Sequence, residues 1–351
     1  MMKIFRYILL PFSLVYGGII RMRNKLFDKN ILRSATFDFP LICVGNLAVG
    51  GTGKTPMVEY LVNLLQQNYK VATLSRGYRR KTKGFLIADE NSEASDLGDE
   101  PMQIHQKFPG ISVAVAEERV MGIPQLLFNK PETQLIILDD AFQHRAVKAG
   151  LNILLTGYDN LYPKDFLLPT GNLRDLKNSS KRAHIIVVTK CKPDLNEDER
   201  ESIIKELNPL KNQKIYFTKI IYKSPYHLFQ KNIFPFDKEL EVLLVCGIAN
   251  PTVILETFES KVSSIKIMRY KDHYNFHSDD INNIKERFSK IKNEKKMILI
   301  TEKDAAKLSI FVNDLNQVPI YVLPMEHKFL FGGENEFKND VFNFVSSFTN
   351  K

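Results

Sequence analysis

A glycine-rich stretch between an apolar run and a helix-like segment constrains the fold of this chain more than any other feature. The apolar run is Leu41 to Val44. The stretch that follows it includes Ala48, Val49, Gly50, Gly51, Thr52, Gly53, Lys54 and Thr55. Glycines let the backbone bend with its amides inward, so these amides and the positive end of the next helix can surround a phosphate.

The order of strand, loop, Gly-Lys-Thr and helix therefore predicts a nucleotide-binding P-loop. In such a loop Lys54 bridges the outer phosphates and Thr55 binds magnesium. Ala48 stands where the usual pattern has its first glycine, so the entry turn is altered while the lysine end is intact. The alternative is a flexible turn before a helix.

Further short apolar runs predict a mainly parallel sheet. They are near-continuous in Val, Ile and Leu, as in strands that are buried on both faces. With the first run, they cover residues 41–44, 71–74, 85–88, 111–115, 135–138, 152–155 and 185–189. Helix-like stretches separate many of them, so we expect an α/β fold of the P-loop NTPase type, with helices flanking the sheet.

The length of 351 residues exceeds that of a usual single domain, and the pattern changes near residue 214. There an apolar segment is followed by Pro225 and by Phe234-Pro235-Phe236. We interpret 29–213 as the P-loop lobe, 214–236 as an extended linker and 237–351 as a smaller α/β lobe. Runs at 242–246, 265–268, 297–300 and 320–323 are the expected strands of that lobe.

Residues 1–28 predict a membrane-associated helix. The stretch from Tyr7 to Ile20 is uncharged and mostly apolar, and basic residues bracket it. It is too short to span the hydrocarbon core, which needs about 20 apolar residues. An interfacial helix fits better, with its basic residues on anionic headgroups. A secretory signal and a plain core helix are the alternatives, although no small-residue cleavage site precedes the basic cluster.

The net charge of +9 indicates an anionic partner, which could be a nucleotide, a nucleic acid or an acidic membrane. The sequence has no helix-turn-helix or zinc spacing, so we predict no nucleic-acid binding. Cys43, Cys191 and Cys246 lie far apart beside apolar runs, which predicts buried thiols in a reducing compartment.

Two acids, Asp139 and Asp140, end the apolar run 135–138. In P-loop folds an acid at such a strand end lies beside the phosphate loop and holds magnesium directly or through water. Neighbouring residues of an extended chain point to opposite sides, so we expect one acid to serve the metal and the other to orient a neighbour. The alternative is a strand end with exposed acids.

Several blocks of the chain are distinctive when they are taken together. They are Gly45-Asn46 with Gly50-Gly51-Thr52-Gly53-Lys54-Thr55-Pro56, Ser75-Arg76-Gly77-Tyr78, Gly98-Asp99-Glu100-Pro101, Asp139-Asp140-Ala141-Phe142-Gln143-His144-Arg145, Gly171-Asn172-Leu173-Arg174-Asp175, Asp272-His273-Tyr274-Asn275-Phe276 and Thr301-Glu302-Lys303-Asp304-Ala305. In this order and spacing the blocks resemble the tetraacyldisaccharide 4'-kinase family of lipid A biosynthesis, and the likeness covers nearly the whole chain. Departures from the family pattern are Ala141 and Asp175, where the family more often has glycine and glutamate.

The resemblance implies a kinase at the cytoplasmic face of the bacterial inner membrane, peripheral or monotopic. It would use ATP and Mg²⁺ and transfer the γ-phosphate to the 4'-hydroxyl of a tetraacyldisaccharide 1-phosphate, giving lipid IVA. The implied partners are this acylated substrate and the membrane surface, and no obligate protein partner is implied.

The resemblance also assigns the catalytic residues. A sugar hydroxyl needs a base to accept its proton as the phosphoryl group arrives. The family pattern makes Asp99 that base and His273 its partner, and Lys54 acts on the phosphates. The alternative for Asp99 is a helix N-cap before Pro101.

The remaining expected site residues surround the substrate and the metal. Arg76, Arg119 and Arg174 carry guanidinium forks that suit the 1-phosphate or the transferred group. Glu100 and Gln143 are expected to support the metal or nucleotide shell, with Gln143 also near the substrate.

A regulatory P-loop ATPase switch is the competing hypothesis from another class. The loop alone is compatible with it. Acid and histidine motifs spread over both lobes argue against it, because they indicate a cleft for a second substrate.

Overall fold

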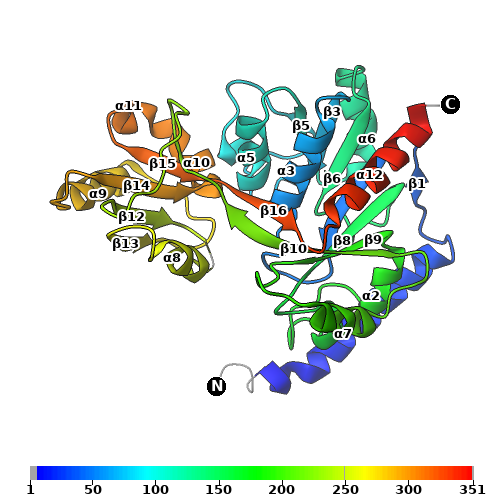
Figure 1. The fold of residues 1–351 in the computed structure, drawn as a ribbon. Helices are drawn as coiled ribbons and strands as arrows, with labels where there is room; N and C mark the ends of the chain where they lie inside the picture. Colours follow the sequence, from blue (N-terminus) through cyan, green and yellow to red (C-terminus); the bar gives the residue numbers. More distant parts are fainter. Residues whose placement is uncertain (1–5, 249, 350–351) are drawn as a thin grey trace.

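The chain folds into two α/β lobes, with an N-terminal helix lying across the larger one (Figure 1). The computed structural model describes residues 6–248 and 250–349. The larger lobe holds the glycine-rich loop, and the smaller lobe is joined to it through two strands. The fold class and the presence of two lobes are thus confirmed.

A nine-stranded sheet forms the centre of the large lobe, in the order β16-β10-β9-β8-β2-β6-β3-β5-β4. The two edge strands, β16 and β4, are antiparallel to their neighbours, and the other pairs are parallel. The strands are β2 (Leu41–Asn46), β3 (Val71–Ser75), β4 (Leu86–Ile87), β5 (Ser112–Val115), β6 (Leu135–Asp139), β8 (Leu151–Gly157), β9 (Ile185–Thr189), β10 (Lys214–Tyr222) and β16 (Met325–Phe329).

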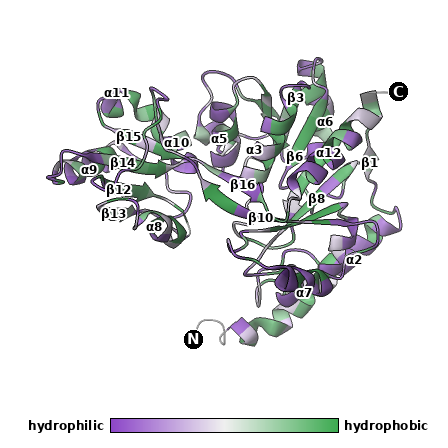
Figure 2. Ribbon diagram, viewed as in Figure 1, coloured by the Kyte–Doolittle hydropathy of each residue, from purple (hydrophilic) through white to green (hydrophobic). Residues whose placement is uncertain are grey.

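Helices cover both faces of this sheet, as its two-sided apolar strands require. On one face, α3 buries Met57, Leu61 and Leu65 completely, and α12 adds Phe337 and Val341 to the same core. Each such side chain contributes about 1.5–3 kcal/mol of burial free energy. Figure 2 shows the apolar residues concentrated in the strands. The helices of this lobe are α3 (Lys54–Leu65), α4 (Ala94–Leu97), α5 (Asp99–Lys107), α6 (Arg119–Asn129), α7 (Glu197–Leu207) and α12 (Glu334–Thr349).

The small lobe is a five-stranded sheet in the order β11-β15-β14-β12-β13, which is parallel except for β11. Its strands are β11 (Tyr226–His227), β12 (Glu241–Cys246), β13 (Ser264–Arg269), β14 (Lys296–Thr301) and β15 (Ile320–Leu323). Its helices are α8 (Thr252–Phe258), α9 (Ser278–Ser289), α10 (Glu302–Leu308) and α11 (Val312–Leu315). The expected strands of both lobes are all present.

The predicted boundaries of the lobes differ from the observed ones. The segment 214–236 is not an extended linker, because β10 pairs with β9 in the large sheet and β11 pairs with β15 in the small one. The segment 237–351 does not stay in the small lobe either, because β16 and α12 return to the large lobe. The sequence pattern hides this return, since β16 pairs with a strand about one hundred residues earlier.

The N-terminal segment is helical, as predicted, with η1 (Tyr7–Leu9) leading into α2 (Leu10–Asp28). The residues that α2 buries against the large lobe are Ser13, Gly17, Ile20, Asn24 and Phe27. No helix among the described residues is long and apolar enough to cross a membrane.

Short elements complete the fold, and they include the pair β1 (Ala35–Thr36) and β7 (Val147–Lys148). The remaining turns are η2 (Tyr162–Lys164), η3 (Lys177–Arg182) and η4 (Ser309–Phe311). The cysteines Cys43, Cys191 and Cys246 are free and buried, as expected.

Candidate active site

The glycine-rich loop connects β2 to α3 in the centre of the large sheet. Gly50 and Gly53 have φ angles of 106° and 80°, a region that favours glycine. Ala48 needs no such angle, because it forms an antiparallel bridge with Leu173. The altered entry turn at Ala48 is therefore an extended segment, and backbone hydrogen bonds join it to residues 172–174.

The two acids lie next to this loop, because β6 is the direct neighbour of β2 in the sheet. The segment after β6 packs tightly against β2: a side chain at Gly45 would come within 2.6 Å of Phe142 Cβ. Asp139 ends the strand, whereas Asp140 has a φ angle of 49° and leaves the extended conformation. The two carboxylates therefore have different surroundings. The cause is the turn that begins at Asp140, and not the alternation of side chains along an extended strand that the sequence predicted.

Asp139 is buried, and its Oδ1 atom has no hydrogen-bond partner in the structure. Burial and the charge of Asp140 raise its pKa to about 7. A buried carboxylate that forms no ion pair with the other described residues fits a cation site. No group of three or more metal-binding side chains is preformed in the described part of the chain. Mg²⁺ suits such a site, since it commonly takes one or two carboxylates and completes its shell with phosphate oxygens and water.

Asp140 is bound by protein cations instead. Arg174 grips it with both terminal nitrogens, one of them 3.0 Å from Oδ2. The Nζ atom of Lys54 lies 3.7 Å from Asp140 Oδ1. Although burial raises the pKa of Asp140, Lys54 and Arg174 lower it below its usual value. Asp140 thus orients the lysine of the loop and the predicted substrate arginine.

The predicted base and its partner meet across the two lobes. Asp99 is the first residue of α5 in the large lobe, and His273 lies in the small lobe between β13 and α9. The Nδ1 atom of His273 is 3.0 Å from Asp99 Oδ2. Asp99 does not cap α5, because Gly98 occupies the N-cap position.

Two lysines of α10, Lys303 and Lys307, lie next to the contact between Asp99 and His273. The sequence analysis assigned no role to either lysine. Lys303 Nζ lies 3.1 Å from His273 Nε2 and 3.3 Å from Glu100 Oε1. An ammonium group only donates, so Nε2 accepts and the proton on Nδ1 points to Asp99. The block Thr301-Glu302-Lys303-Asp304-Ala305 was a signal for Lys303, but its partners come from elsewhere in the fold.

Lys307 is the second lysine. Its side chain is only 4% exposed, and Nζ lies 3.5 Å from Asp99 Oδ2. Burial raises the pKa of Asp99, but the hydrogen bond from His273 and the charges of Lys307 and Lys303 outweigh it, so the net pKa is lowered. Asp99 is therefore held as a carboxylate. Glu100 is also near the acids, because its charge raises the pKa of Asp139.

The other predicted substrate residues have mixed settings. Arg119 is 3% exposed and donates to the carbonyls of Ala116, Glu117 and Asp139. These hydrogen bonds indicate that Arg119 supports the end of β6, where Asp139 lies. Direct contact of Arg119 with the substrate stays a prediction. Arg76 is exposed. Burial lowers the pKa of Arg119, and the positive charge of Arg76 lowers it further.

Gln143 and Asp175 hold other parts of the site together. Gln143 donates to the carbonyl of Asn46 at 2.6 Å, so it fixes the start of the loop. Asp175 is buried and accepts hydrogen bonds from Asn24, Ser179 and Arg182. Asp175 therefore anchors α2 to the large lobe.

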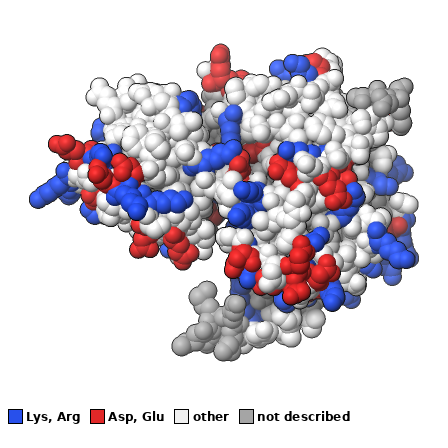
Figure 3. Space-filling view, viewed as in Figure 1, with Lys and Arg blue, Asp and Glu red and all other residues white. Residues whose placement is uncertain are grey.

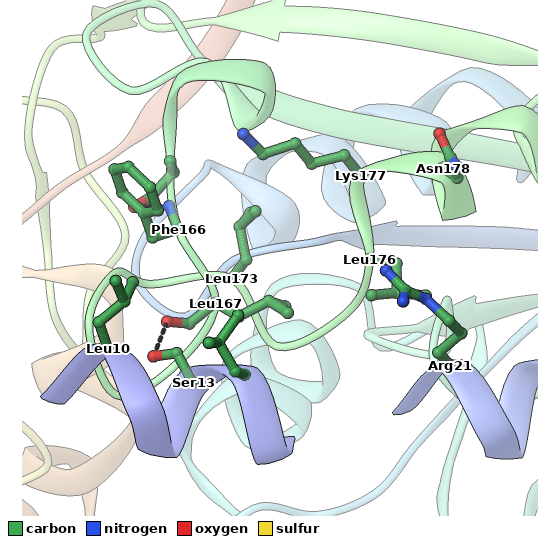
Figure 4. A pocket seen from close by; sticks show the side chains of 11 residues that line it. Leu10, Ser13, Arg21, Phe166, Leu167, Leu173, Leu176, Lys177 and Asn178 are labelled. Carbon is green, nitrogen blue, oxygen red and sulfur yellow. Dashed lines mark hydrogen bonds between the residues drawn. The ribbon is translucent and has the colours of Figure 1, made fainter. Parts of the chain in front are cut away.

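An apolar cavity of about 380 Å³ lies between α2 and the segment 165–178 (Figure 4). Ser13 fixes the two walls by donating to the carbonyl of Leu167 at 3.0 Å. Two basic side chains, Arg21 and Lys177, also line the cavity. Its apolar lining consists of Leu10, Leu14, Phe166, Leu167, Leu173 and Leu176. Leu173 and Leu176, on either side of Arg174 in sequence, line the cavity, so it lies near the segment whose arginine binds Asp140.

Basic side chains gather at the junction of the two lobes, with acidic ones among them (Figure 3). Together the site offers a phosphate loop, the buried acid Asp139, and a second acid, Asp99, that lies next to His273 and two lysines. This arrangement can bind a triphosphate and accept a proton from a second substrate.

Comparisons with known proteins agree along the whole chain. A family model described as tetraacyldisaccharide-1-P 4'-kinase matches residues 5–345. The protein named tetraacyldisaccharide 4'-kinase from Flavobacterium johnsoniae is 46% identical over 330 residues, which cover 93% of this chain and 95% of that protein. The protein of the same name from Bacteroides thetaiotaomicron is 43% identical over 352 residues, covering 96% of this chain and 92% of that protein.

A solved structure is similar as well. It is described as LpxK from Aquifex aeolicus in complex with ATP, and it matches with a TM-score of 0.76 and 31% identity. The match covers 97% of this chain and 99% of that chain.

Proposed function

This chain belongs to the tetraacyldisaccharide 1-phosphate 4'-kinase family, and we propose that the cluster at the lobe junction carries out the family reaction. The γ-phosphoryl group of ATP passes to the 4'-hydroxyl of an acylated disaccharide 1-phosphate, giving ADP and lipid IVA. The proton of the hydroxyl leaves to a protein base. The comparisons confirm the resemblance to this family that the sequence indicated, and the regulatory ATPase switch is not favoured.

We assign the base role to Asp99. It is ionised, because His273 donates to it and two lysines lower its pKa. A carboxylate of low basicity accepts the proton as the new P–O bond forms, rather than before. His273 keeps the accepting oxygen in place, and Lys303 keeps His273 in the tautomer that donates to Asp99.

The loop and the acids of β6 handle the triphosphate. Lys54 and the loop amides bind its oxygens, and Asp140 with Arg174 keeps Lys54 in position. The residues that would hold Mg²⁺ are Asp139 and Thr55, and the ion would neutralise charge on the β- and γ-phosphates. Glu100 contributes a further negative charge near Asp139.

The acyl chains of the substrate need apolar surroundings, and α2 supplies them. Several exposed side chains in its first half are large and apolar, with Phe12, Leu14 and Val15 65–70% exposed. We assign this face to the surface of the bilayer, and the cavity behind it to the part of an acyl chain nearest the sugar. Arg21 and Lys177 suit the 1-phosphate or lipid headgroups by charge.

The contact between Asp99 and His273 is the single observation that carries this proposal. The two residues are 174 positions apart in sequence, and their contact joins the two lobes next to Lys303 and Lys307 of α10. A binding switch has no need of a carboxylate held in this way for a second substrate.

The test is a transfer assay with purified protein, labelled ATP and the disaccharide 1-phosphate in detergent. The wild-type protein should yield a bisphosphorylated lipid. Asp99→Asn should lower kcat by roughly 10²-fold or more and leave ATP affinity unchanged, because it removes the proton acceptor. Asp198→Asn, an exposed acid in the first turn of α7, is the matched control and should behave as wild type.

Two outcomes would contradict the proposal. Release of inorganic phosphate without any phosphorylated lipid would favour the ATPase switch. Full transfer by Asp99→Asn would remove Asp99 as the base.

A further inference from the structure

We propose that His327 and Thr189 are positioning residues that hold two successive carbonyl groups of the phosphate loop from behind, so that the following amides face the triphosphate. The inference rests on the proposed ATP-binding role of the loop. Neither residue belongs to the motifs that the sequence singled out.

The first carbonyl is that of Thr52. The hydroxyl of Thr189, at the end of β9, donates to it at 2.9 Å. The side chain of Thr52 is fixed as well, because Asn46 donates to its hydroxyl at 2.8 Å. Thr52 is thus held at both its carbonyl and its side chain.

The second carbonyl is that of Gly53. It accepts a hydrogen bond from His327 Nε2 at 2.9 Å and a second one from the amide of Met57 at 3.2 Å. His327 lies on β16 and is 3% exposed. A side chain at residue 53 would come within 3.0 Å of the His327 ring, so the two residues approach as closely as glycine allows.

These two bonds set the direction of two amides. In a planar trans peptide, the carbonyl and the following N–H point in opposite directions. Because the carbonyls of Thr52 and Gly53 point toward β9 and β16, the amides of Gly53 and Lys54 point away from these strands. Within residues 6–248 and 250–349, neither amide donates a hydrogen bond to a protein atom. Both are therefore available to phosphate oxygens.

The second nitrogen of His327 fixes the ring. A carbonyl only accepts, so Nε2 carries the proton and Nδ1 accepts from the hydroxyl of Thr218 at 2.9 Å. Thr218 lies on β10, which pairs with β16. Because β10 and β16 are the two strands that join the lobes, the loop is held by the same strands that connect it to the small lobe.

The test compares variants of His327 in steady-state kinetics and in binding of a non-hydrolysable ATP analogue. His327→Phe keeps the ring volume and loses both polar atoms. We expect it to raise the KM for ATP and the Kd for the analogue about tenfold, while the KM for the lipid acceptor stays unchanged. His327→Gln keeps a donor for the Gly53 carbonyl and should return the KM for ATP to within about threefold of wild type.

Matched controls separate positioning from general stability. His227→Phe replaces another buried histidine, which lies on β11 in the sheet of the small lobe, and should leave the KM for ATP unchanged. Thr189→Val removes the hydroxyl behind Thr52 and should raise the KM for ATP, whereas Thr189→Ser should not.

Two results would overturn the inference: an unchanged KM for ATP in both His327→Phe and Thr189→Val, or equal losses for ATP and the acceptor. If the wild-type protein itself failed to bind ATP, the proposed function would fail instead, so the two failures are distinguishable.

Discussion

Two neighbouring carboxylates acquire different chemistry in this site because their surroundings differ. Asp140 is neutralised by Arg174 and Lys54, and its pKa lies below the usual value. Asp139 is buried with an unpartnered oxygen, and its pKa is raised to about 7. These two adjacent acids therefore differ: Asp140 orients protein cations, whereas Asp139 is the acid that we propose as the cation ligand.

A substitution of Asp139 tests this division. Asp139→Asn should lower magnesium-dependent turnover by roughly 10²-fold or more, because it removes the negative charge that would hold the ion. Binding of ATP in the presence of EDTA should stay unchanged. The measurements are turnover and nucleotide binding as a function of Mg²⁺ concentration.

Asp140→Asn is the contrasting variant. It should weaken nucleotide binding with and without Mg²⁺, because Lys54 and Arg174 lose their shared partner. The assignment is wrong if the two variants show the opposite pattern.

His327 gives the protein a pH dependence of stability. Burial, together with the charge of Lys190, lowers its pKa to about 4, against 6.5 for the unfolded chain. The unfolded state therefore binds this proton first as the pH falls. The stabilising contribution is fully present above pH 6.5 and is lost between pH 6.5 and 4.

The contribution of His327 should amount to about 2 kcal/mol between pH 7 and pH 5. It is measured as the difference between wild type and His327→Gln in urea unfolding at the two pH values. Because both proteins contain the other histidines, the effect of those histidines cancels in this difference. One of them is His144, whose pKa is also lowered to about 4. Parallel pH profiles for the two proteins would contradict the prediction.

At the scale of elements, α2 exposes most of its large apolar side chains. The side that packs on the protein contains mostly small and polar residues, including Ser13, Gly17 and Asn24. A larger side chain at Gly17 would come within 2.8 Å of Leu167, so the helix lies close to the protein surface. Ile20 and Phe27 also pack inward, but the other large apolar side chains of α2 are exposed or half-buried. An apolar outward face suits a helix that meets lipid.

Charges on the outward face of α2 should weaken membrane association. Phe12→Asp with Val15→Asp should reduce binding to anionic vesicles severalfold and lower turnover of vesicle-embedded substrate. ATP affinity and the free energy of unfolding should change little, because both side chains are exposed. Vesicle sedimentation and equilibrium unfolding provide the measurements.

Phe128→Asp is the matched control, since Phe128 is 86% exposed on α6. It should leave vesicle binding unchanged. Equal vesicle binding by the α2 variant and the control would show that this face does not meet lipid.

At the scale of the whole molecule, a buried cluster joins the two lobes. Lys107 of α5 contacts Glu59 of α3 at 2.6 Å and Glu302 of α10 at 2.5 Å. Burial and Glu302 raise the pKa of Glu59 to about 7. Although burial lowers the pKa of Lys107, the two glutamates raise it above its usual value, so the lysine stays charged.

Removal of this lysine should destabilise the lobe junction. Lys107→Met leaves two buried carboxylates without a cation and should lower the free energy of unfolding by about 3 kcal/mol. Lys290→Met removes an exposed lysine from its pair with Glu286 and should cost less than about 1 kcal/mol. Chemical denaturation measures both, and equal effects would argue against a role of the cluster.

Much of each lobe was predictable from the sequence. The strands follow from apolar runs, and the phosphate loop follows from Gly53, Lys54 and Thr55 after β2. The acids after β6 were placed beside that loop because P-loop folds have an acid at such a strand end next to the phosphate loop. The family pattern also paired Asp99 with His273.

Apart from that pair, the features that remained hidden depend on contacts between distant segments. The return of β16 and α12 to the large lobe placed His327 behind the loop, and the packing of α10 on α5 brought Lys303 and Lys307 to Asp99. Periodicity and backbone chemistry act over a few residues, so the sequence by itself determined the elements, the phosphate loop and the fold class. Contacts between residues 174 to 274 positions apart form only when distant segments of the chain pack together, and only the tertiary structure decided which side chains complete the site.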